Sequence, residues 1–378
     1  MIDTSNYLIS EAPNTIGVVF YDYSVKAGGQ RVAANVFNHL CNQGYRVVFI
    51  SVFFRNKQAS FALDEKIKLY PLNEKECHFR EVRKPSVKEF SEIVERENIK
   101  VLIAEGFSAD LISAIVSQKC KIPFIHCEHT SLENRYYSED LASRIYRYLG
   151  ARKSKAIVAL TEGNKKSFEK KYRGVGKKTF VIPNWVENDD EKVGSYKKES
   201  RIIVSIGRAD PVKGFDRLID IAARVKNRCK GWEWHIWGDF DSEFGRKIEA
   251  EIDTRGLNDF VKIRGVTESI GEVYSGAGVL VMTSYYEGMP MVLLEAGLYG
   301  IPLLSFDIPT GPNEIIVNGV NGYLVEDGEI DEMANRICEL VVNESERLRL
   351  SENSEINLKR YKKERVAEAW HQLLNQFV

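Results

Sequence analysis

The feature that most constrains the fold of this 378-residue chain is a repeated alternation of short apolar runs with longer amphipathic segments. Runs such as TIGVVFY (15–21) and RVVFISVF (46–53) are nearly unbroken by polar residues, which is typical of parallel strands covered on both faces. The pattern predicts strands at 15–21, 46–53, 100–104, 123–127, 156–160 and 179–182, and again at 201–206, 233–237, 261–264, 278–283 and 302–306. The segments between the strands carry helical periodicity, as does most of 330–378.

Two such series in one chain predict an α/β protein with two doubly wound, Rossmann-like domains. A length of 378 residues suits two domains better than one. We place the boundary near 183–198, where the sequence ENDDEKVGSYKKES is polar and charged like a linker. In doubly wound sheets ligands bind at the carboxyl ends of the strands, so two facing domains would form a cleft.

The composition favours a protein of a reducing compartment. The six cysteines form no CxxC pair and no run with the spacing of a zinc site. The first 13 residues lack the apolar core of a signal peptide, and no apolar stretch has the length of a membrane span. We therefore expect a soluble, cytoplasmic protein, with attachment to a membrane surface left open.

The charge is divided unevenly along the chain. Residues 1–180 carry 29 Lys and Arg against 20 Asp and Glu, a net charge of +9, whereas the remainder has a net charge of -10. One interpretation is that the first half meets an anionic partner such as a lipid phosphate. The other is that these charges only solvate helix faces.

In each half of the chain, a glycine-containing turn follows the first strand. Gly28 and Gly29 open a helix, where free N–H groups attract an anion, although a plain tight turn is equally compatible with them. In the second half Arg208 follows a strand and Lys213 precedes the next helix. Two cations in such a loop are suited to a diphosphate leaving group, while a surface pair of cations is the plainer interpretation.

The segment SYYEGMPMVLLEAGLYG (284–300) places two carboxylates, with seven residues between them, around a strand-to-helix turn. Glu287 lies in the turn and Glu295 lies in the helix, and Pro290 suits the first helical position. The backbone N–H groups of Met291 and Val292 would then be free at a helix N-terminus. One carboxylate can accept hydrogen bonds from sugar hydroxyls and the other from a ribose.

Two further signals concern histidine and aspartate. His129 follows a strand in IHCEHT and is a candidate substrate contact, whereas His126 inside the strand is expected in the core. Asp239 and Asp241 match a DxD pattern, but two carboxylates without further ligands are weak evidence for a metal. We expect no metal site and no cofactor.

These residues resemble the retaining glycosyltransferases of family four, which have the two-Rossmann architecture called GT-B. The resemblance covers nearly the whole chain and is carried by GGQRVA (28–33), CEHTS (127–131), GRADPVKGFDRLI (207–219) and EGMPMVLLEAGLYGIPLLSFDIPTGPNEII (287–316). It implies an acceptor-binding domain at 1–183, a nucleotide-sugar domain at 184–355, and a helix at 356–378 that packs back on the first domain.

The resemblance also implies roles at single positions. Arg208 and Lys213 would bind the donor diphosphate near Gly28 and Gly29, and Glu287 would orient the donor sugar. His129 would lie near the reacting end of the sugar. The remaining donor contacts would come from the ribose ligand Glu295 and from backbone at Val266, Gly288, Met289, Met291 and Val292.

The implied reaction transfers a hexose or N-acetylhexosamine, from UDP rather than GDP, to a glycan or polyprenyl-diphosphate-linked glycan in polysaccharide biosynthesis. The implied mechanism retains the anomeric configuration without a dedicated base. An anionic membrane surface, contacted by Arg144, Arg147, Arg152, Lys153 and Lys155, is a further expected partner, and nucleic acid is not. The alternatives left open are a nucleotide-sugar epimerase, a phosphorylase, a catalytically silent sugar-nucleotide-binding protein and an NAD-dependent dehydrogenase.

Overall fold

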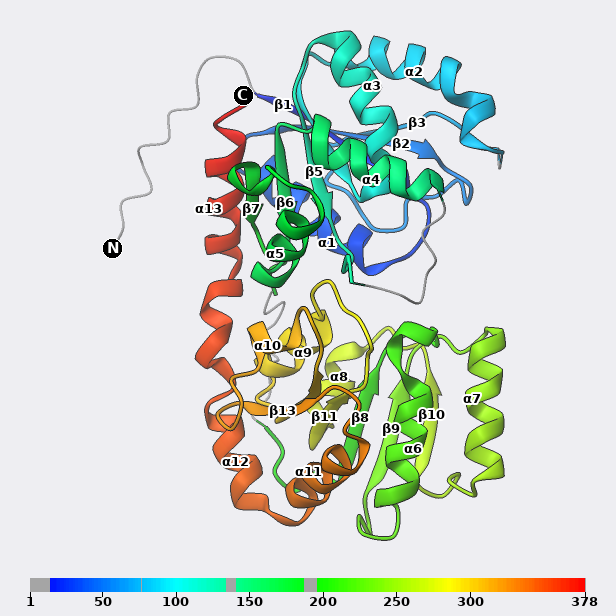
Figure 1. Ribbon diagram of the computed structural model, residues 1–378, viewed down its shortest axis with the longest axis vertical. Helices are drawn as coiled ribbons and strands as arrows, with labels where there is room; N and C mark the ends of the chain where they lie inside the picture. Colours follow the sequence, from blue (N-terminus) through cyan, green and yellow to red (C-terminus); the bar gives the residue numbers. More distant parts are fainter. Residues whose placement is uncertain (1–13, 76, 134–140, 187–195, 378) are drawn as a thin grey trace. The chain divides into compact units, whose positions relative to one another are not determined.

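The computed structural model describes residues 14–75, 77–133, 141–186 and 196–377, and the chain divides into two compact units (Figure 1). The first unit takes the chain up to Pro183, apart from a short segment after Thr130, together with the residues from Glu364 onward. The second unit takes Asn184–Lys363. Residues 187–195 of the expected linker lie outside the described residues.

The first unit is built on a parallel sheet of order β3-β2-β1-β4-β5-β6-β7. Its strands are β1 (Thr15–Asp22), β2 (Arg46–Phe53), β3 (Lys68–Pro71), β4 (Ile99–Glu105), β5 (Phe124–Glu128), β6 (Ala156–Ala159) and β7 (Thr179–Val181). Its helices are α1 (Gly28–Asn42), α2 (Phe79–Arg96), η1 (Phe107–Ala109), α3 (Asp110–Cys120), α4 (Leu141–Lys153), α5 (Glu162–Lys171) and η2 (Gly176–Lys178).

The second unit repeats the plan with a parallel sheet of order β10-β9-β8-β11-β12-β13. Its strands are β8 (Ile202–Ile206), β9 (Glu233–Trp237), β10 (Val261–Gly265), β11 (Val279–Met282), β12 (Leu303–Asp307) and β13 (Gly322–Glu326). Its helices are η3 (Pro211–Lys213), α6 (Phe215–Val225), α7 (Glu243–Thr254), α8 (Ile270–Ser275), α9 (Met291–Leu298), α10 (Pro312–Ile315), α11 (Ile330–Val342), α12 (Glu344–Glu352) and η4 (Ser354–Tyr361).

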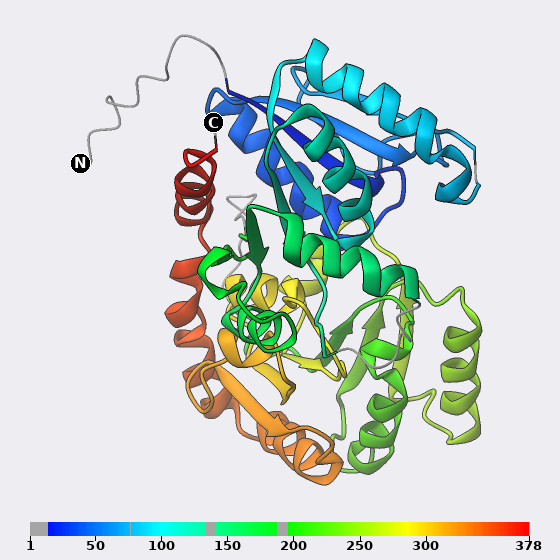
Figure 2. The same ribbon diagram turned by 45° about the horizontal axis from the view of Figure 1, so that its top comes forward.

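Two parallel sheets with helices on both faces confirm the predicted α/β class (Figures 1 and 2). The strands β3 and β13 are additions to the prediction. Each lies at the edge of its sheet and is only partly buried along much of its length, so neither has the unbroken apolar run that marks the central strands. Within the described residues, no helix is both long and apolar enough to cross a membrane.

The C-terminal segment differs from the single helix expected at 356–378. Residues 354–361 form the 3-10 helix η4, which groups with the second unit, and the final helix α13 is Lys363–Leu374. This helix, red in Figure 1, packs on α1 of the first unit, where the rings of Phe37 and Trp370 are 5.8 Å apart. His371 adds a polar contact of 3.1 Å between its Nδ1 and the Tyr45 hydroxyl.

The strand orders determine where a ligand site is expected. The order of connections reverses between β1 and β4 in the first unit and between β8 and β11 in the second. In doubly wound sheets the crevice at the carboxyl ends of these two strands is the usual ligand site. The topology therefore predicts ligand-binding residues in the loops that leave β8 and β11 and in those that leave β1, β4 and the adjacent β5.

Candidate functional site

Lys213 and Glu287 meet at the reversal point of the second sheet. Lys213 ends η3 in the loop after β8, and Glu287 lies in the loop after β11. The Lys213 Nζ is 2.8 Å from the Glu287 Oε1, and the two side chains are 32% and 11% exposed. The two loops meet closely because Gly214 adopts φ 64°, and a Cβ there would stand 2.1 Å from the Thr283 carbonyl oxygen.

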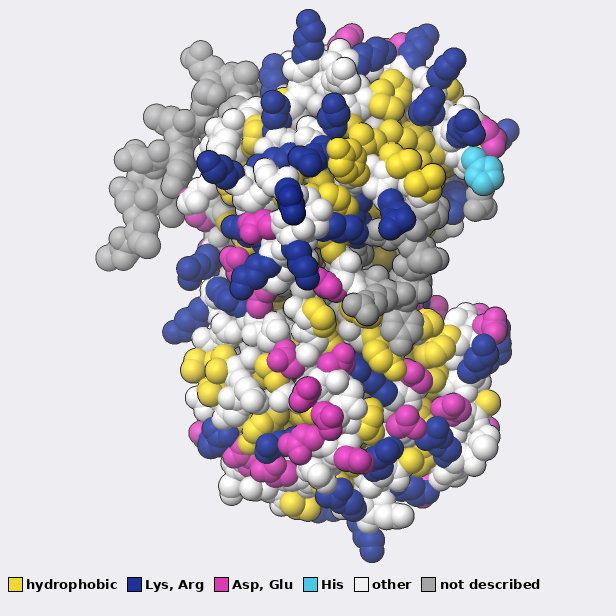
Figure 3. Space-filling model, viewed as in Figure 1, with side chains coloured by type: hydrophobic (Ala, Val, Ile, Leu, Met, Phe, Trp, Pro, Cys, Tyr) yellow, Lys and Arg dark blue, Asp and Glu magenta, His cyan; other side chains and the backbone are white. Residues whose placement is uncertain are grey.

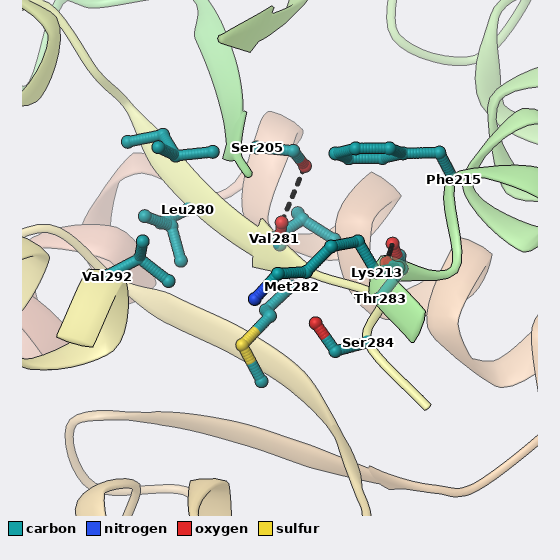
Figure 4. Close-up of a pocket in the computed structure, with 10 residues that line it drawn as sticks. Ser205, Lys213, Phe215, Leu280, Val281, Met282, Thr283, Ser284 and Val292 are labelled. Carbon is teal, nitrogen blue, oxygen red and sulfur yellow. Dashed lines mark hydrogen bonds between the residues drawn. The ribbon is translucent and has the colours of Figure 1, made fainter. Parts of the chain in front are cut away.

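Further polar groups hold Glu287 in place. The Ser284 hydroxyl donates to the Glu287 Oε1 at 2.7 Å, and the Thr310 hydroxyl donates to the Glu287 carbonyl. Lys213 and Ser284 also line a small pocket of about 10 Å³ at the end of β11, shown in Figure 4. Ser205 and Val281 line the same pocket, and the Ser205 hydroxyl donates to the Val281 carbonyl at 2.6 Å. The carboxylate of Glu287 is thus oriented before any ligand binds.

Arg217, which the sequence reasoning did not single out, fixes the same loop from α6. Its guanidinium lies 4.0 Å from the ring centres of both Tyr285 and Phe306. It donates to the carbonyls of Thr283 and Ser284, and its Nη1 is 2.6 Å from an oxygen of Asp327. The available sequence signal was a charged residue on the apolar face of a strongly amphipathic helix.

Arg208 follows β8 directly and keeps its side chain 64% exposed. Its nearest acidic partner is Asp210, at 3.6 Å between Nη2 and Oδ2. Asp210 itself caps η3 by accepting from the Val212 backbone N–H at 3.0 Å. The structure therefore leaves the Arg208 guanidinium in solvent beside the loop that carries Lys213.

The N-terminus of α9 lies directly after the Glu287 loop. Pro290 is the residue before the helix rather than its first residue, and the helix begins at Met291. The N–H groups of its first turn, which include those of Met291 and Val292, have no partner inside the helix. The Met289 side chain turns inward, is 7% exposed, and its sulfur accepts from the Asn184 N–H at 3.3 Å.

Glu295 lies one turn into α9 and is already paired. Its Oε2 accepts a hydrogen bond of 2.6 Å from the Tyr274 hydroxyl, and the Tyr274 ring stacks on Tyr299. Val266 follows β10 and is 75% exposed. The preceding Gly265 accepts from the Gly238 N–H at 2.8 Å, which joins the ends of β9 and β10.

In the first unit, Gly28 and Gly29 are the first two residues of α1. A Cβ built at either position meets no protein atom within 4 Å. Packing of the protein against itself therefore does not explain these glycines. Glycine at these two positions would let a ligand approach the backbone at the start of the helix closely.

His129 follows β5 and contacts Glu105 at the end of β4. Its Nε2 hydrogen-bonds the Glu105 Oε2, and its side chain remains 22% exposed. Burial opposes protonation of this imidazole, but the Glu105 carboxylate outweighs burial and raises the pKa of His129 above its usual value. His126, three residues earlier and within β5, is fully buried as expected, and its Nδ1 is 2.8 Å from the Oδ1 of Asp110.

A buried ion pair sets the turn that presents His129. Glu128 accepts from the Thr130 N–H at 3.0 Å and from the Thr130 hydroxyl at 2.6 Å. Its Oε2 is 3.4 Å from the Arg147 Nε, and both side chains are almost completely buried. Burial favours the neutral acid, but Arg147 and His126 lower the pKa of Glu128 overall.

The expected membrane patch is corrected by this pair. Arg147 is 4% exposed and lies over the ring of Phe107 at 4.3 Å, so it is no surface cation. Arg144, Arg152, Lys153 and Lys155 are exposed as expected. Sequence reasoning missed the inward turn of Arg147 because a short basic helix gives no sign of which cation meets a buried acid.

Asp239 and Asp241 are occupied within their own loop. Asp239 accepts from the Asp241 N–H at 2.9 Å, and Asp241 is 94% exposed beside Arg246. Across the residues that the structure describes, no group of three or more His, Cys, Asp and Glu is arranged to hold a metal ion.

Comparison with protein families matches both halves of the chain. Residues 27–190 match the model described as Glycosyltransferase Family 4, and residues 186–356 match that of Glycosyl transferases group 1. Two relatives match over nearly their whole length. An uncharacterized glycosyltransferase of Haemophilus influenzae is 27% identical, and the match covers 95% of this chain and 99% of the relative. The amylovoran biosynthesis glycosyltransferase AmsD of Erwinia amylovora is 25% identical, covering 93% and 97%.

Among solved structures, HepE of Anabaena in complex with UDP-glucose has a TM-score of 0.79. It is 18% identical, and the match covers 96% of this chain and 99% of that one. At 18% sequence identity, this similarity shows a shared fold and nothing more.

Proposed function

The chain belongs to the group 1 glycosyltransferases of the family 4 type, and from this premise we propose that it transfers a hexose or N-acetylhexosamine from a UDP-sugar to a glycan acceptor. The observation that carries the proposal is the Lys213–Glu287 pair at the reversal point of the second sheet. It places a cation and an oriented carboxylate beside a helix N-terminus, which are the groups that a sugar diphosphate needs.

The cations would act on the leaving group. As the bond between the sugar C1 and the phosphate oxygen breaks, negative charge collects on the diphosphate. Lys213 is held in place by Glu287, whereas the exposed Arg208 is able to swing onto the diphosphate when the donor binds. Both interactions strengthen as the charge develops, so they lower the barrier more than they tighten donor binding.

Glu287 and Glu295 would hold the two sugars of the donor. With one oxygen engaged by Lys213 and Ser284, the Glu287 carboxylate still offers acceptor positions to hydroxyls of the transferred sugar. The N–H groups at Gly288 and Met289 and at the start of α9 would add donors to the sugar and phosphate. Glu295, beside Tyr274, would bind the ribose, and the exposed backbone at Val266 would meet the base.

We infer a mechanism that retains the anomeric configuration. The acceptor oxygen bonds to C1 on the face that the diphosphate leaves, and the departing phosphate oxygen takes the acceptor's proton. No side chain has to serve as the base in this scheme. Within the first unit we propose donor-contact roles for His129, whose pKa is raised by Glu105, and for Gly28 and Gly29 at the start of α1. The reaction would need neither metal nor cofactor.

The acceptor side of the proposal rests on the first half of the chain. A net charge of +9 over residues 1–180 suits an acceptor that carries phosphate, such as a polyprenyl-diphosphate-linked glycan. One relative is named for amylovoran biosynthesis and another, 28% identical over 233 residues, is a lipopolysaccharide 1,6-galactosyltransferase, which supports a role in surface polysaccharide synthesis. We place the reaction in the cytoplasm, at the inner face of the cytoplasmic membrane.

The test is calorimetric titration of UDP-glucose, UDP-galactose, UDP-N-acetylglucosamine and the corresponding GDP-sugars, each with EDTA present. We expect one UDP-sugar to bind, with affinity unchanged by EDTA and about tenfold or more weaker in Arg208→Ala. Arg246→Ala is the matched control, because Arg246 is also 64% exposed and lies 3.4 Å from an aspartate in the same unit. Failure of every nucleotide sugar to bind, or equal losses in the two variants, would contradict the proposed donor site.

A further inference from the structure

Helix α4 turns three large apolar side chains toward solvent. Leu141 is 73% exposed, Ile145 47% and Tyr148 51%, and their spacing of four and three residues puts them on one face. These are three of eight large hydrophobic side chains that are exposed among the described residues, and they share a helix of 13 residues. A helix at a water-facing surface ordinarily has the opposite arrangement.

The inward face of the same helix fixes this orientation. The buried residues of α4 are Arg147, Gly150 and Ala151. Gly150 packs so tightly against α3 that a Cβ would stand 2.1 Å from an oxygen of the buried Asp110. Arg147 reaches the buried Glu128. Rotating α4 to bury its apolar stripe would place a Leu or Ile on these carboxylates and expose their partner, so the stripe stays outside.

Cations accompany the apolar stripe. The helix sequence LASRIYRYLGARK contains no acidic residue, and Arg144, Arg152 and Lys153 on the helix are exposed, as is Lys155 just beyond it. Lys178 lies beside the end of the helix, where its Nζ donates to the Ser154 carbonyl at 2.7 Å. Figure 3 shows hydrophobic side chains gathered among Lys and Arg on the face of the first unit where α4 lies.

We propose that α4 is a docking helix for an anionic lipid bilayer. Leu141, Ile145 and Tyr148 would enter the boundary between headgroups and acyl chains, and Arg144, Arg152, Lys153 and Lys155 would meet lipid phosphates. The described residues of α4 combine an apolar stripe with Arg and Lys and include no acid, which is the pattern of an amphipathic helix lying in the interface of an anionic bilayer. The inference rests on the proposed function, in which a lipid-linked acceptor would reach the enzyme from this surface.

The buried face of α4 contacts the turn that carries His129. Arg147 joins the helix to Glu128 and approaches the Thr130 hydroxyl at 3.4 Å, so the lipid-facing helix and the turn that carries His129 form one packed assembly. A bilayer bound to the outer face of α4 would hold the acceptor edge of the first unit at the level of the lipid headgroups.

The experiment is co-sedimentation of the full chain with phosphatidylcholine vesicles, with and without phosphatidylglycerol, at low and raised salt. We expect binding only with phosphatidylglycerol. The partition coefficient should fall about tenfold or more in Ile145→Glu and in Leu141→Glu, and roughly fivefold in Arg152→Glu. Val342→Glu, at an apolar residue 76% exposed in the second unit, and Lys84→Glu, at an exposed residue of α2, are the matched controls and should bind as wild type.

Three results would overturn the docking helix: no binding to anionic vesicles, equal binding to neutral ones, or equal losses in the control variants. A change of mass in sedimentation caused by Ile145→Glu would instead assign the stripe to contact between two copies of the chain. Titration of the UDP-sugar into Ile145→Glu separates this inference from the proposed function. If α4 is the docking helix, Ile145→Glu should bind the UDP-sugar as wild type does while losing vesicle binding. A wild type that binds the UDP-sugar but not anionic vesicles refutes only the docking helix, whereas a wild type that binds no UDP-sugar refutes the proposed function.

Discussion

At the scale of single residues, His129 is the group whose charge the fold controls most directly. Glu105, at the end of the neighbouring strand, accepts its hydrogen bond, and Glu128 adds a second negative charge nearby. Both carboxylates favour the imidazolium and together outweigh the effect of burial. The position of His129 beside β4 follows from the strand order, which the sequence pattern alone does not reveal.

Replacing Glu105 with Gln is predicted to lower the pKa of His129. The raised pKa means that the ion pair stabilises the folded protein fully below the unfolded value of 6.5 and that this contribution is lost as pH rises through the folded pKa. Wild type should therefore lose stability over that window relative to Glu105→Gln. Titration of the His129 ring signals by NMR, assigned with His129→Gln, and urea unfolding between about pH 5.5 and pH 8.5 measure both effects. An unchanged His129 titration in Glu105→Gln would contradict the assigned cause.

Arg147 contributes to stability mainly by neutralising the buried carboxylate of Glu128. Its removal would strand the Glu128 carboxylate in the interior, where burial opposes its charge. We predict that Arg147→Ala lowers the free energy of unfolding by about 3–5 kcal/mol. Arg144→Ala, one turn away and exposed, should change it by less than about 0.5 kcal/mol. Urea denaturation of both variants gives the comparison, and similar values would show that the buried pair contributes little.

At the scale of elements, the central strands were predictable and the edges were not. The runs at 15–21, 46–53 and 201–206 are apolar throughout because both faces of those strands are covered, so they stand out in the sequence. The edge strands β3 and β13 lack that covering. The final helix was expected to begin near residue 356, but it begins at Lys363. The prediction was too early because the preceding 3-10 helix η4 has a similar composition and a similar apolar periodicity.

The loops of the candidate site divide in the same way. That Lys213 and Glu287 approach each other follows from a parallel sheet in which β8 and β11 are neighbours, a pairing that the spacing of the strands suggests only indirectly. The contributions of Arg217, Ser284 and Thr310 could not be predicted, because each depends on backbone carbonyls or hydroxyls whose direction only the folded loop sets.

At the scale of the whole molecule, the division of charge parallels the division into units. The basic residues of the first half concentrate in part around α4, whereas the second unit surrounds its cations Arg208 and Lys213 with acidic partners. The sequence pattern was sufficient for the two-unit plan, whereas the charge division by itself does not show which basic residues are exposed, as the buried Arg147 demonstrates.

The central claim is that the Lys213–Glu287 pair serves sugar transfer, and turnover of the UDP-sugar found by titration tests it most directly. We would compare wild type, Glu287→Gln and Glu243→Gln, because Lys247 lies 2.8 Å from Glu243 as Lys213 does from Glu287, but on the exposed surface of α7. We predict that kcat falls about a hundredfold in Glu287→Gln and stays at the wild-type value in Glu243→Gln. Equal turnover in all three proteins would contradict the account.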